Sequence, residues 1–404
     1  MMASFTMIRQ RAVSMLISAL LAACSSVLRV RALNDVPVAW TTLEAAYNPS
    51  LVEYGGKYIS ALKRTTFRKA NHKVFWVNHL YVCVGPQGVL EGLRCQTYNP
   101  WLEPYLECEF DSDVRDGKTD VTGLGDIKVW VWPGRGLYTI FGRKPERTPG
   151  AGPYCTSKVV YDQWIAQIRP EQSAGPWRLQ QPLRLYLTSS FKYPESPKYV
   201  MEKNWMPWVY HGEGGTETLY VTHMVNPHRI LEVGVNGGCE VRYETNGRPD
   251  LFGPFAGHSI HGGPPVVWID GKLARGGQPY YMGIMHHIEL IEATESSSSA
   301  RRRKKAKKLR LYRHFAYKFE AQPPFTITEV SDELPLTFFR HPNYPAKAHV
   351  AYVSGLFLGN NGTLYISYGA GDREARVMTM TVAEMEAMFT GRITFLPPAT
   401  RMAV

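Results

Sequence analysis

The chain has 404 residues, enough for one large domain or two ordinary ones, and its 44% hydrophobic and 12% aromatic content is that of a globular protein. The net charge of +11 is local, because eight positive residues fall in the range 301–310 and four flank an apolar N-terminal segment. The rest of the chain is close to neutral, which argues against a general nucleic-acid-binding surface.

The N-terminal segment, residues 1–35, has the pattern of an export signal. Arg9 and Arg11 precede Ala12–Leu28, an apolar stretch without charge. This arrangement predicts a signal peptide or a short membrane anchor, and the two remain open because the stretch is at the low edge of a spanning length. We therefore expect the protein in the secretory pathway, in the Golgi or ER lumen and membrane-anchored, or outside the cell.

The cysteines fit an oxidising compartment but leave the pairing open. Five cysteines follow Cys24, so at least one is unpaired within the monomer. Cys83, Cys95 and Cys108 are near enough in sequence for a local bridge. No CxxC pair is present, which argues against a structural zinc site. A glycosylation sequon begins at Asn361.

From residue 48 onward, short apolar strands alternate with turns of Gly, Asp or Asn, which predicts a series of β-hairpins. Long amphipathic helices are few, and Val382–Met388 is the best short one. In chain order, the predicted strand pairs are Lys57–Lys63 with Lys73–Val84, Ile127–Trp132 with Leu137–Phe141, Trp208–Tyr210 with Leu219–His223, Pro265–Ile269 with Tyr280–Met285, and Leu356–Leu358 with Leu364–Tyr368.

The spacing of these hairpins predicts the architecture, an all-β five-bladed β-propeller over residues 40–398. Each unit is long enough for a four-stranded blade, and no linker follows residue 45. A serine run and a basic run at 295–308 predict a disordered insertion within a blade, either a solvated loop or a site for an acidic partner. The five units begin near Asn48, Asp126, Asn204, Gly262 and Ser354.

Polar residues at the starts of the innermost strands of a propeller collect at one end of its central channel. Carboxylates there bind sugar hydroxyls and act as acid or base, Asn, Lys and His supply hydrogen bonds, and Trp stacks on pyranose rings. Each residue alone also has a structural explanation, such as a turn cap for Asp126 or a bulge for Asn204. The residues expected to converge are Asp126, Glu202, Lys203, Asn204, His228 and Asp372.

Neither a metal nor a cofactor is expected. The spacings of His258, His261, His286 and His287 match no standard ligand set. The glycine-rich stretches at 212–215 and 262–263 do not fit the phosphate-binding loop patterns, which argues against an α/β nucleotide-sugar fold.

Four motifs in this order resemble a superfamily of five-bladed propeller glycosidases, glycoside phosphorylases and glycosyltransferases. The chain is similar to the β-mannoside phosphorylases and hydrolases of glycoside hydrolase family 130 and to related protist mannosyltransferase/phosphorylases, in patches from Asn48 to Met388. The motifs are Asn48-Pro49 with Gly56-Lys57-Tyr58, the segment from Glu202 to Pro207, Asn226-Pro227-His228, and Ser367-Tyr368-Gly369 with Asp372.

The resemblance implies that Asp126 is the catalytic general acid/base. The family motif Glu-Asp-Pro-Arg reads Gly125-Asp126-Ile127-Lys128 here, so the acid is kept while Lys128 replaces the two-pronged arginine. Mannose-type sugars are the substrates that the resemblance implies, and Lys203, His228 and Arg229 are candidates for holding phosphate. The expected substrate-binding residues are Asn48, Lys128, Glu202, Lys203, Asn204, Trp205, His228, Tyr368 and Asp372.

Three functions remain open from the sequence. The first is transfer of a glycosyl, and by resemblance a mannosyl, group in glycan assembly. The second is phosphorolysis or hydrolysis of oligosaccharides. The third is a noncatalytic glycan-binding propeller, and this alternative stays open because the motif around Asp126 is altered. The expected partners are an oligosaccharide or glycan and phosphate or a sugar phosphate, with no nucleic acid.

Overall fold

The computed structural model describes most of the chain from residue 34 to residue 396. The predictions for the N-terminal export segment, Glu202, His258 and Asp372, and for most of the basic insertion, fall on residues outside the described ranges. The described ranges are 34–37, 39–40, 46–70, 73–97, 124–143, 162–170, 177–188, 203–256, 260–292, 308–338, 350–371 and 374–396.

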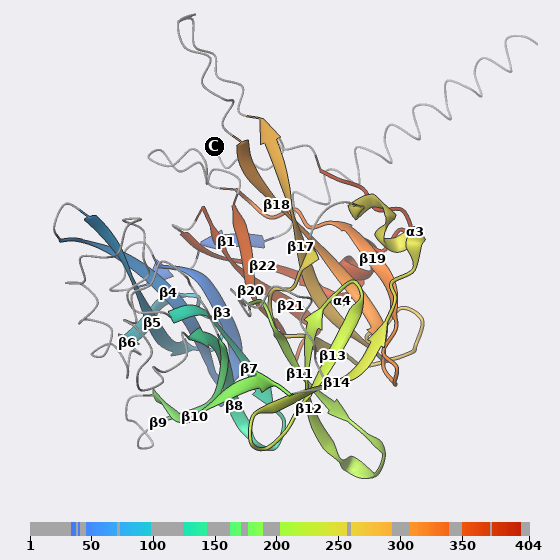
Figure 1. Ribbon diagram of the computed structural model, residues 1–404, viewed down its shortest axis with the longest axis horizontal. Coiled ribbons are helices and arrows are strands. Elements are labelled where there is room, and N and C mark those ends of the chain that lie inside the picture. The colour runs from blue at the N-terminus through green and yellow to red at the C-terminus, as the bar shows by residue number, and fades with distance from the viewer. Residues whose placement is uncertain are drawn as a thin grey trace, which may run out of the picture.

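The described strands form five antiparallel meanders in chain order, so the all-β prediction is confirmed (Figure 1). The strands are β3 (Ala46–Tyr54), β4 (Lys57–Ala70), β5 (Lys73–Pro86) and β6 (Glu91–Thr97); β7 (Leu124–Trp132), β8 (Gly136–Arg143), β9 (Asp162–Pro170) and β10 (Trp177–Leu187); β11 (Met206–His211), β12 (Glu217–Met224), β13 (His228–Val233) and β14 (Gly238–Thr245); β15 (Ile260–His261), β16 (Val267–Ile269), β17 (Tyr280–Glu292), β18 (Lys308–Glu320) and β19 (Ile327–Glu333); and β20 (Ala351–Leu358), β21 (Thr363–Ala370) and β22 (Glu374–Thr381).

Three further pairings link parts of the chain that are distant in sequence. The N-terminal strand β1 (Asn34–Pro37) pairs antiparallel with β22, and the two-residue β2 (Ala39–Trp40) pairs with β6. A short parallel pairing of β10 with β14 joins the outer strands of the second and third meanders into one eight-stranded sheet. The last meander is therefore completed by the start of the chain.

The predicted hairpins are confirmed at all five places. A further hairpin joins β3 to β4 through a turn with a left-handed backbone, where Gly55 and Gly56 have φ of 59° and 69°. Two consecutive positive φ values are what a two-residue hairpin needs, and glycine adopts them without steric cost. The predicted helix is also present as α4 (Val382–Glu386), capped by the Thr381 side chain. No helix among the described residues is long and apolar enough to cross a membrane.

The apolar core is divided among the interfaces between neighbouring meanders. One cluster joins the first, second and fifth meanders, and three others join the second to the third, the third to the fourth and the fourth to the fifth. Large buried aromatic side chains dominate these clusters, for example Trp208 and Phe319 between the third and fourth meanders. Each meander therefore packs on the next, and the fifth packs on the first.

Buried serine hydroxyls fasten the first strands of neighbouring meanders. Ser50 in β3 accepts from the Val129 backbone N–H in β7 at 2.8 Å, and Ser354 in β20 donates to the Pro49 carbonyl at 2.8 Å. Ser367 accepts from the Leu51 N–H at 3.1 Å. Because these bonds are buried, they fix how the starts of β3, β7 and β20 lie against each other.

The one disulfide among the described residues joins Cys83 in β5 to Cys95 in β6, and Cys239, whose thiol donates to the Gly237 carbonyl at 3.4 Å, is buried. The bridge links directly opposite residues of two paired strands, a register that the sequence did not reveal. We expect the double variant Cys83→Ser/Cys95→Ser to lose about 2–4 kcal/mol of unfolding free energy, measured by denaturant titration. Reduced wild type should match the variant, and an unchanged midpoint would contradict the prediction.

Candidate functional site

Bulges at the starts of the first strands direct polar side chains toward one another around Asp126. The pairing of β7 with β8 shifts between Leu124 and Ile127, and Asp126 lies in that irregularity. The pairing of β3 with β4 shifts between Tyr47 and Ser50, where Asn48 has a φ of 54°. A bulge places an extra residue out of the strand's alternation, so it directs side chains that regular pairing would not.

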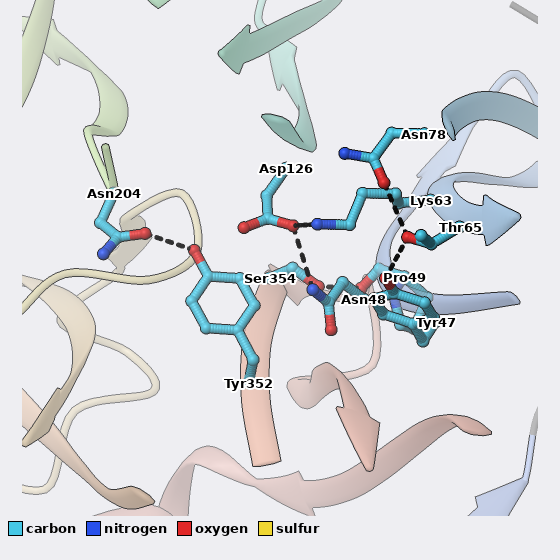
Figure 2. Close-up of polar contacts among 10 residues, drawn as sticks. All are labelled: Tyr47, Asn48, Pro49, Lys63, Thr65, Asn78, Asp126, Asn204, Tyr352 and Ser354. Atoms are coloured by element: carbon cyan, nitrogen blue, oxygen red, sulfur yellow. Dashed lines mark hydrogen bonds and ion pairs between the residues drawn. The ribbon is translucent and has the colours of Figure 1, made fainter. Parts of the chain in front are cut away.

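The Asp126 carboxylate is the centre of this cluster (Figure 2). Lys63 Nζ lies 2.6 Å from Asp126 Oδ1, and Asn48 Nδ2 donates to the same oxygen at 3.0 Å. Figure 2 shows the other carboxylate oxygen directed toward the side on which Asn204 and Tyr352 lie. That second oxygen therefore faces side chains of the third and fifth meanders.

The charge state of Asp126 follows from these contacts. Burial opposes ionisation, but the charge and hydrogen bond of Lys63, with smaller effects from Asn48 and Lys203, hold the pKa of Asp126 well below its usual value. The side chain is 25% exposed, so solvent or substrate reaches it. Asp126 is thus a carboxylate, and a hydrogen-bond and proton acceptor, throughout the physiological range.

A second polar pair faces Asp126 from the third and fifth meanders. Asn204 has a φ of 63° and precedes β11, and its Oδ1 accepts from the Tyr352 hydroxyl at 2.7 Å. Burial and the negative charge of Asp126 raise the pKa of Tyr352 above its usual value, so the phenol remains a donor. The pair presents an oriented amide to the hollow.

The hollow around Asp126 has a volume of about 60 Å³ and a polar lining drawn from the first three meanders. Three lysine amines, one carboxylate and three side-chain amides provide donors and acceptors for sugar hydroxyls, and the charged lysines suit an anion. The lining residues are Lys63, Asn78, Gly125, Asp126, Lys128, Gly142, Gln163, Lys203 and Asn204.

Lys128 lies at the floor of the hollow, with only 2% of its surface exposed. Its Nζ donates to the Trp205 carbonyl at 2.9 Å. Burial lowers the pKa of Lys128 to about 7, although the charge of Asp126 opposes the shift. Its amine therefore titrates near neutral pH.

This pKa makes stability depend on pH in a definite direction. Between about pH 7 and the ordinary lysine pKa, the unfolded chain binds a proton that folded Lys128 does not, so stability rises with pH. Relative to a Lys128→Met variant, we expect wild type to gain about 2 kcal/mol between pH 7 and pH 9. Denaturant titrations at both pH values test this, and parallel slopes would contradict it.

Three predicted site residues lie in the packed interior. Trp205 is 1% exposed and belongs to the core between the second and third meanders. His228 is 1% exposed, with Nδ1 2.8 Å from the Phe325 carbonyl, and burial lowers its pKa to about 4. Tyr368 is fully buried, and its hydroxyl accepts from the Thr337 backbone N–H at 3.1 Å. These side chains support the fold around the hollow rather than line it.

The histidines considered as metal ligands lie within packed aromatic surroundings. The His261 and His286 rings have centroids 5.4 Å apart, and burial lowers the pKa of His286 to about 3. His287 packs against Phe255 and Phe315. Within the described ranges, no group of three or more His, Cys, Asp or Glu side chains is placed to hold a metal ion.

Sequence reasoning missed Lys63 as a site residue. Lys63 lies in β4, the second strand of its meander. The prediction was based on residues at the starts of first strands and therefore did not include it. The available signal was its register, since Lys63 pairs with Tyr47, the residue before Asn48. Asn78 in β5 and Gln163 in β9 were missed for the same reason, whereas Tyr352 was missed although it lies near the start of the first strand β20.

The chain was compared with known proteins. No family model matches it, and no curated protein matches it. Solved structures similar to it include MPT-1, a GDP-Man-dependent mannosyltransferase from Leishmania mexicana, with 13% identity, TM-score 0.49, and coverage of 93% of this chain and 98% of that chain.

Two other similar structures are phosphorylases. MPT-4, a mannose phosphorylase from Leishmania mexicana in complex with phosphate ion, has 14% identity and TM-score 0.46 and covers 90% of this chain and 93% of that chain. A β-1,2-mannobiose phosphorylase from Listeria innocua in complex with β-1,2-mannobiose has 10% identity and TM-score 0.48 and covers 88% of this chain and 93% of that chain. The similar structures thus come from the superfamily that the sequence motifs resemble.

Proposed function

We propose that the protein transfers a glycosyl group from a donor with a phosphate-type leaving group to a sugar hydroxyl, with Asp126 as general base. The observation that carries this proposal is the carboxylate of Asp126, held ionised by Lys63 at 2.6 Å. A general base must be unprotonated at the working pH and reachable by the acceptor hydroxyl, and Asp126 meets both requirements.

The described lining of the hollow supplies the groups that transfer needs. Glycoside hydrolases generally use two carboxylates, one as acid and one as base or nucleophile. Among the described residues that line the hollow, Asp126 is the only carboxylate. A phosphate leaving group departs as an anion and needs no protein acid, so one base is sufficient for transfer.

The step balances with the groups present. The acceptor oxygen bonds to the anomeric carbon while the bond from that carbon to the phosphate oxygen breaks. The hydroxyl proton passes to Asp126, and the electron pair leaves with the phosphate, whose charge Lys63 and Lys203 are placed to offset.

The same proposal covers the arrangement of the five meanders and the identity of the transferred sugar. The five meanders are the blades of a five-bladed propeller, which is supported by the packing of each meander on the next and of the fifth on the first. The hollow then lies at one end of the propeller axis. Mannose is the transferred sugar, on the strength of the sequence motifs.

The protein acts in the secretory pathway or outside the cell. This is supported by the Cys83–Cys95 disulfide, because such bonds persist in oxidising compartments. The apolar stretch Ala12–Leu28 is the signal or anchor that would take the chain there.

The test is a donor comparison on the purified chain. Mannose 1-phosphate, GDP-mannose and, with phosphate, mannooligosaccharides are incubated with mannose acceptors, and products are resolved by chromatography and NMR. We expect transfer with inversion at the anomeric carbon, because a single displacement uses one base. Saturable oligosaccharide binding without turnover of any donor would instead identify a noncatalytic glycan-binding protein.

A further inference from the structure

A larger hollow lies at the opposite ends of the same first strands. It has a volume of about 540 Å³, within the range of small-molecule sites. β3, β7, β11 and β20 each place polar site residues near their starts and line this second hollow near their ends. Aromatic rings dominate its lining, and these are Tyr54, Trp130, Trp208, Trp268, Tyr281 and Phe357.

The second hollow is separate from the Asp126 hollow. Along β7, five residues separate Asp126 from Val131, which lines the second hollow. At the rise of an extended strand this is about 16 Å, longer than one pyranose ring. The linings of the two hollows share no residue, although Lys128 and Trp130 are only two positions apart along β7. A sugar ring bound near Val131 therefore does not reach the Asp126 carboxylate.

Trp268 gives this hollow an accessible flat face. Its side chain is 38% exposed, whereas Trp130 and Trp208 are buried. The Trp268 ring lies 4.8 Å from Tyr281, and Tyr281 lies 4.5 Å from Trp208, centroid to centroid. The exposed ring is therefore backed by packed aromatics, which hold it in place as a stacking surface.

A positioned carboxylate completes the site. Glu53 lines the same hollow, and its Oε1 accepts from Gln87 Nε2 at 2.6 Å and from Asn360 Nδ2 at 3.2 Å. These two hydrogen bonds fix the orientation of the Glu53 carboxylate. The carboxylate then serves as an acceptor for the hydroxyl groups of an uncharged ligand. None of the described residues lining the hollow is Lys or Arg, so the lining does not suit a phosphorylated ligand.

We propose that this hollow binds an uncharged pyranose, stacked on Trp268 with its hydroxyls bonded to Glu53 and Asn360. An aromatic face beside a carboxylate and an amide is the inventory that recognises a sugar ring. The site does not depend on Asp126 or on the proposed transfer reaction. It is a second, noncatalytic place for glycan.

The pyranose has two possible sources. One is a soluble oligosaccharide, and the other is a glycan attached to the chain itself. Asn361, in the sequon Asn361-Gly362-Thr363, is exposed in the turn between β20 and β21 and directly follows Asn360. A glycan on Asn361 would start at the rim of the hollow.

Oxidation of Trp268 by N-bromosuccinimide, located by peptide mass spectrometry, distinguishes these sources. In full-length protein from a bacterial host without N-glycosylation, we expect mannotriose, cellotriose or chitotriose to protect Trp268 in a saturable way. Protein from a glycosylating host should be protected without added sugar if its own glycan occupies the site, and Asn361→Gln should remove that protection.

Two variants complete the test. Glu53→Gln should weaken the protecting sugar's affinity at least about tenfold, because it removes a charged acceptor. Asp126→Asn should leave protection unchanged, which separates this site from the reaction. Equal oxidation of Trp268 in both hosts, with and without every trisaccharide, would overturn the proposal, as would protection that Glu53→Gln does not change.

Discussion

Replacing Asp126 with asparagine is expected to lower kcat at least about 100-fold while leaving acceptor binding within a few fold. Asparagine keeps the shape of the side chain and its contact with Asn48, but it cannot take a proton. The loss should therefore fall on kcat rather than on KM, measured with the donor that wild type uses.

The matched control is Asp250→Asn, the same change at an exposed carboxylate whose partner is Arg248. It should keep wild-type turnover. Circular dichroism and a denaturant midpoint establish that the Asp126 variant is folded. If the folded Asp126 variant turned over donor at the wild-type rate, the base would have to be another group.

Replacing Lys63 with methionine is expected to move the acid limb of the pH–rate profile to higher pH. Lys63 provides the largest force that lowers the pKa of Asp126, and burial, which raises this pKa, remains after the substitution. A base works only while ionised, so activity falls as pH drops through its pKa. Wild type should show no acid limb in the range where it stays folded, and the variant should show one.

Lys63→Arg is the informative comparison, because it keeps the positive charge beside Asp126 and should restore most of the wild-type profile. The profiles of wild type, Lys63→Met and Lys63→Arg are measured as kcat against pH, with donor saturating at each pH. Identical profiles for wild type and Lys63→Met would show that Lys63 does not control the charge state of Asp126.

The strands were predictable because each is an apolar run that ends at turn-forming residues close by in the sequence. The turns at Gly55-Gly56 and at Asn360-Asn361-Gly362 interrupt apolar runs, and each is a hairpin in the structure. Pairings between distant segments leave no such local mark. The union of β1 with β22 and the parallel contact of β10 with β14 depend on the whole arrangement of sheets.

The site was predictable only in part because bulges break the alternation of strands. Asp126 and Asn48 were found from their positions at the starts of first strands, and both lie at irregular pairings. The motifs that resemble the propeller family placed Trp205 and Tyr368 in the site, but both side chains point into the core. The face of the strand on which a side chain lies depends on bulges, and the sequence alone does not predict where these bulges occur.

The pairing of the chain's beginning with its last meander constrains the order of folding. Asn34 lies opposite Thr379, so the hydrogen bonds of β1 cannot form until the strand around Thr379 has been synthesised. Contacts between such distant residues carry a large loop-closure cost and slow folding. Earlier meanders are free to form during synthesis, whereas the outer edge of β22 stays open to other strands until β1 arrives. Newly made chains are therefore most prone to mispairing at this last step.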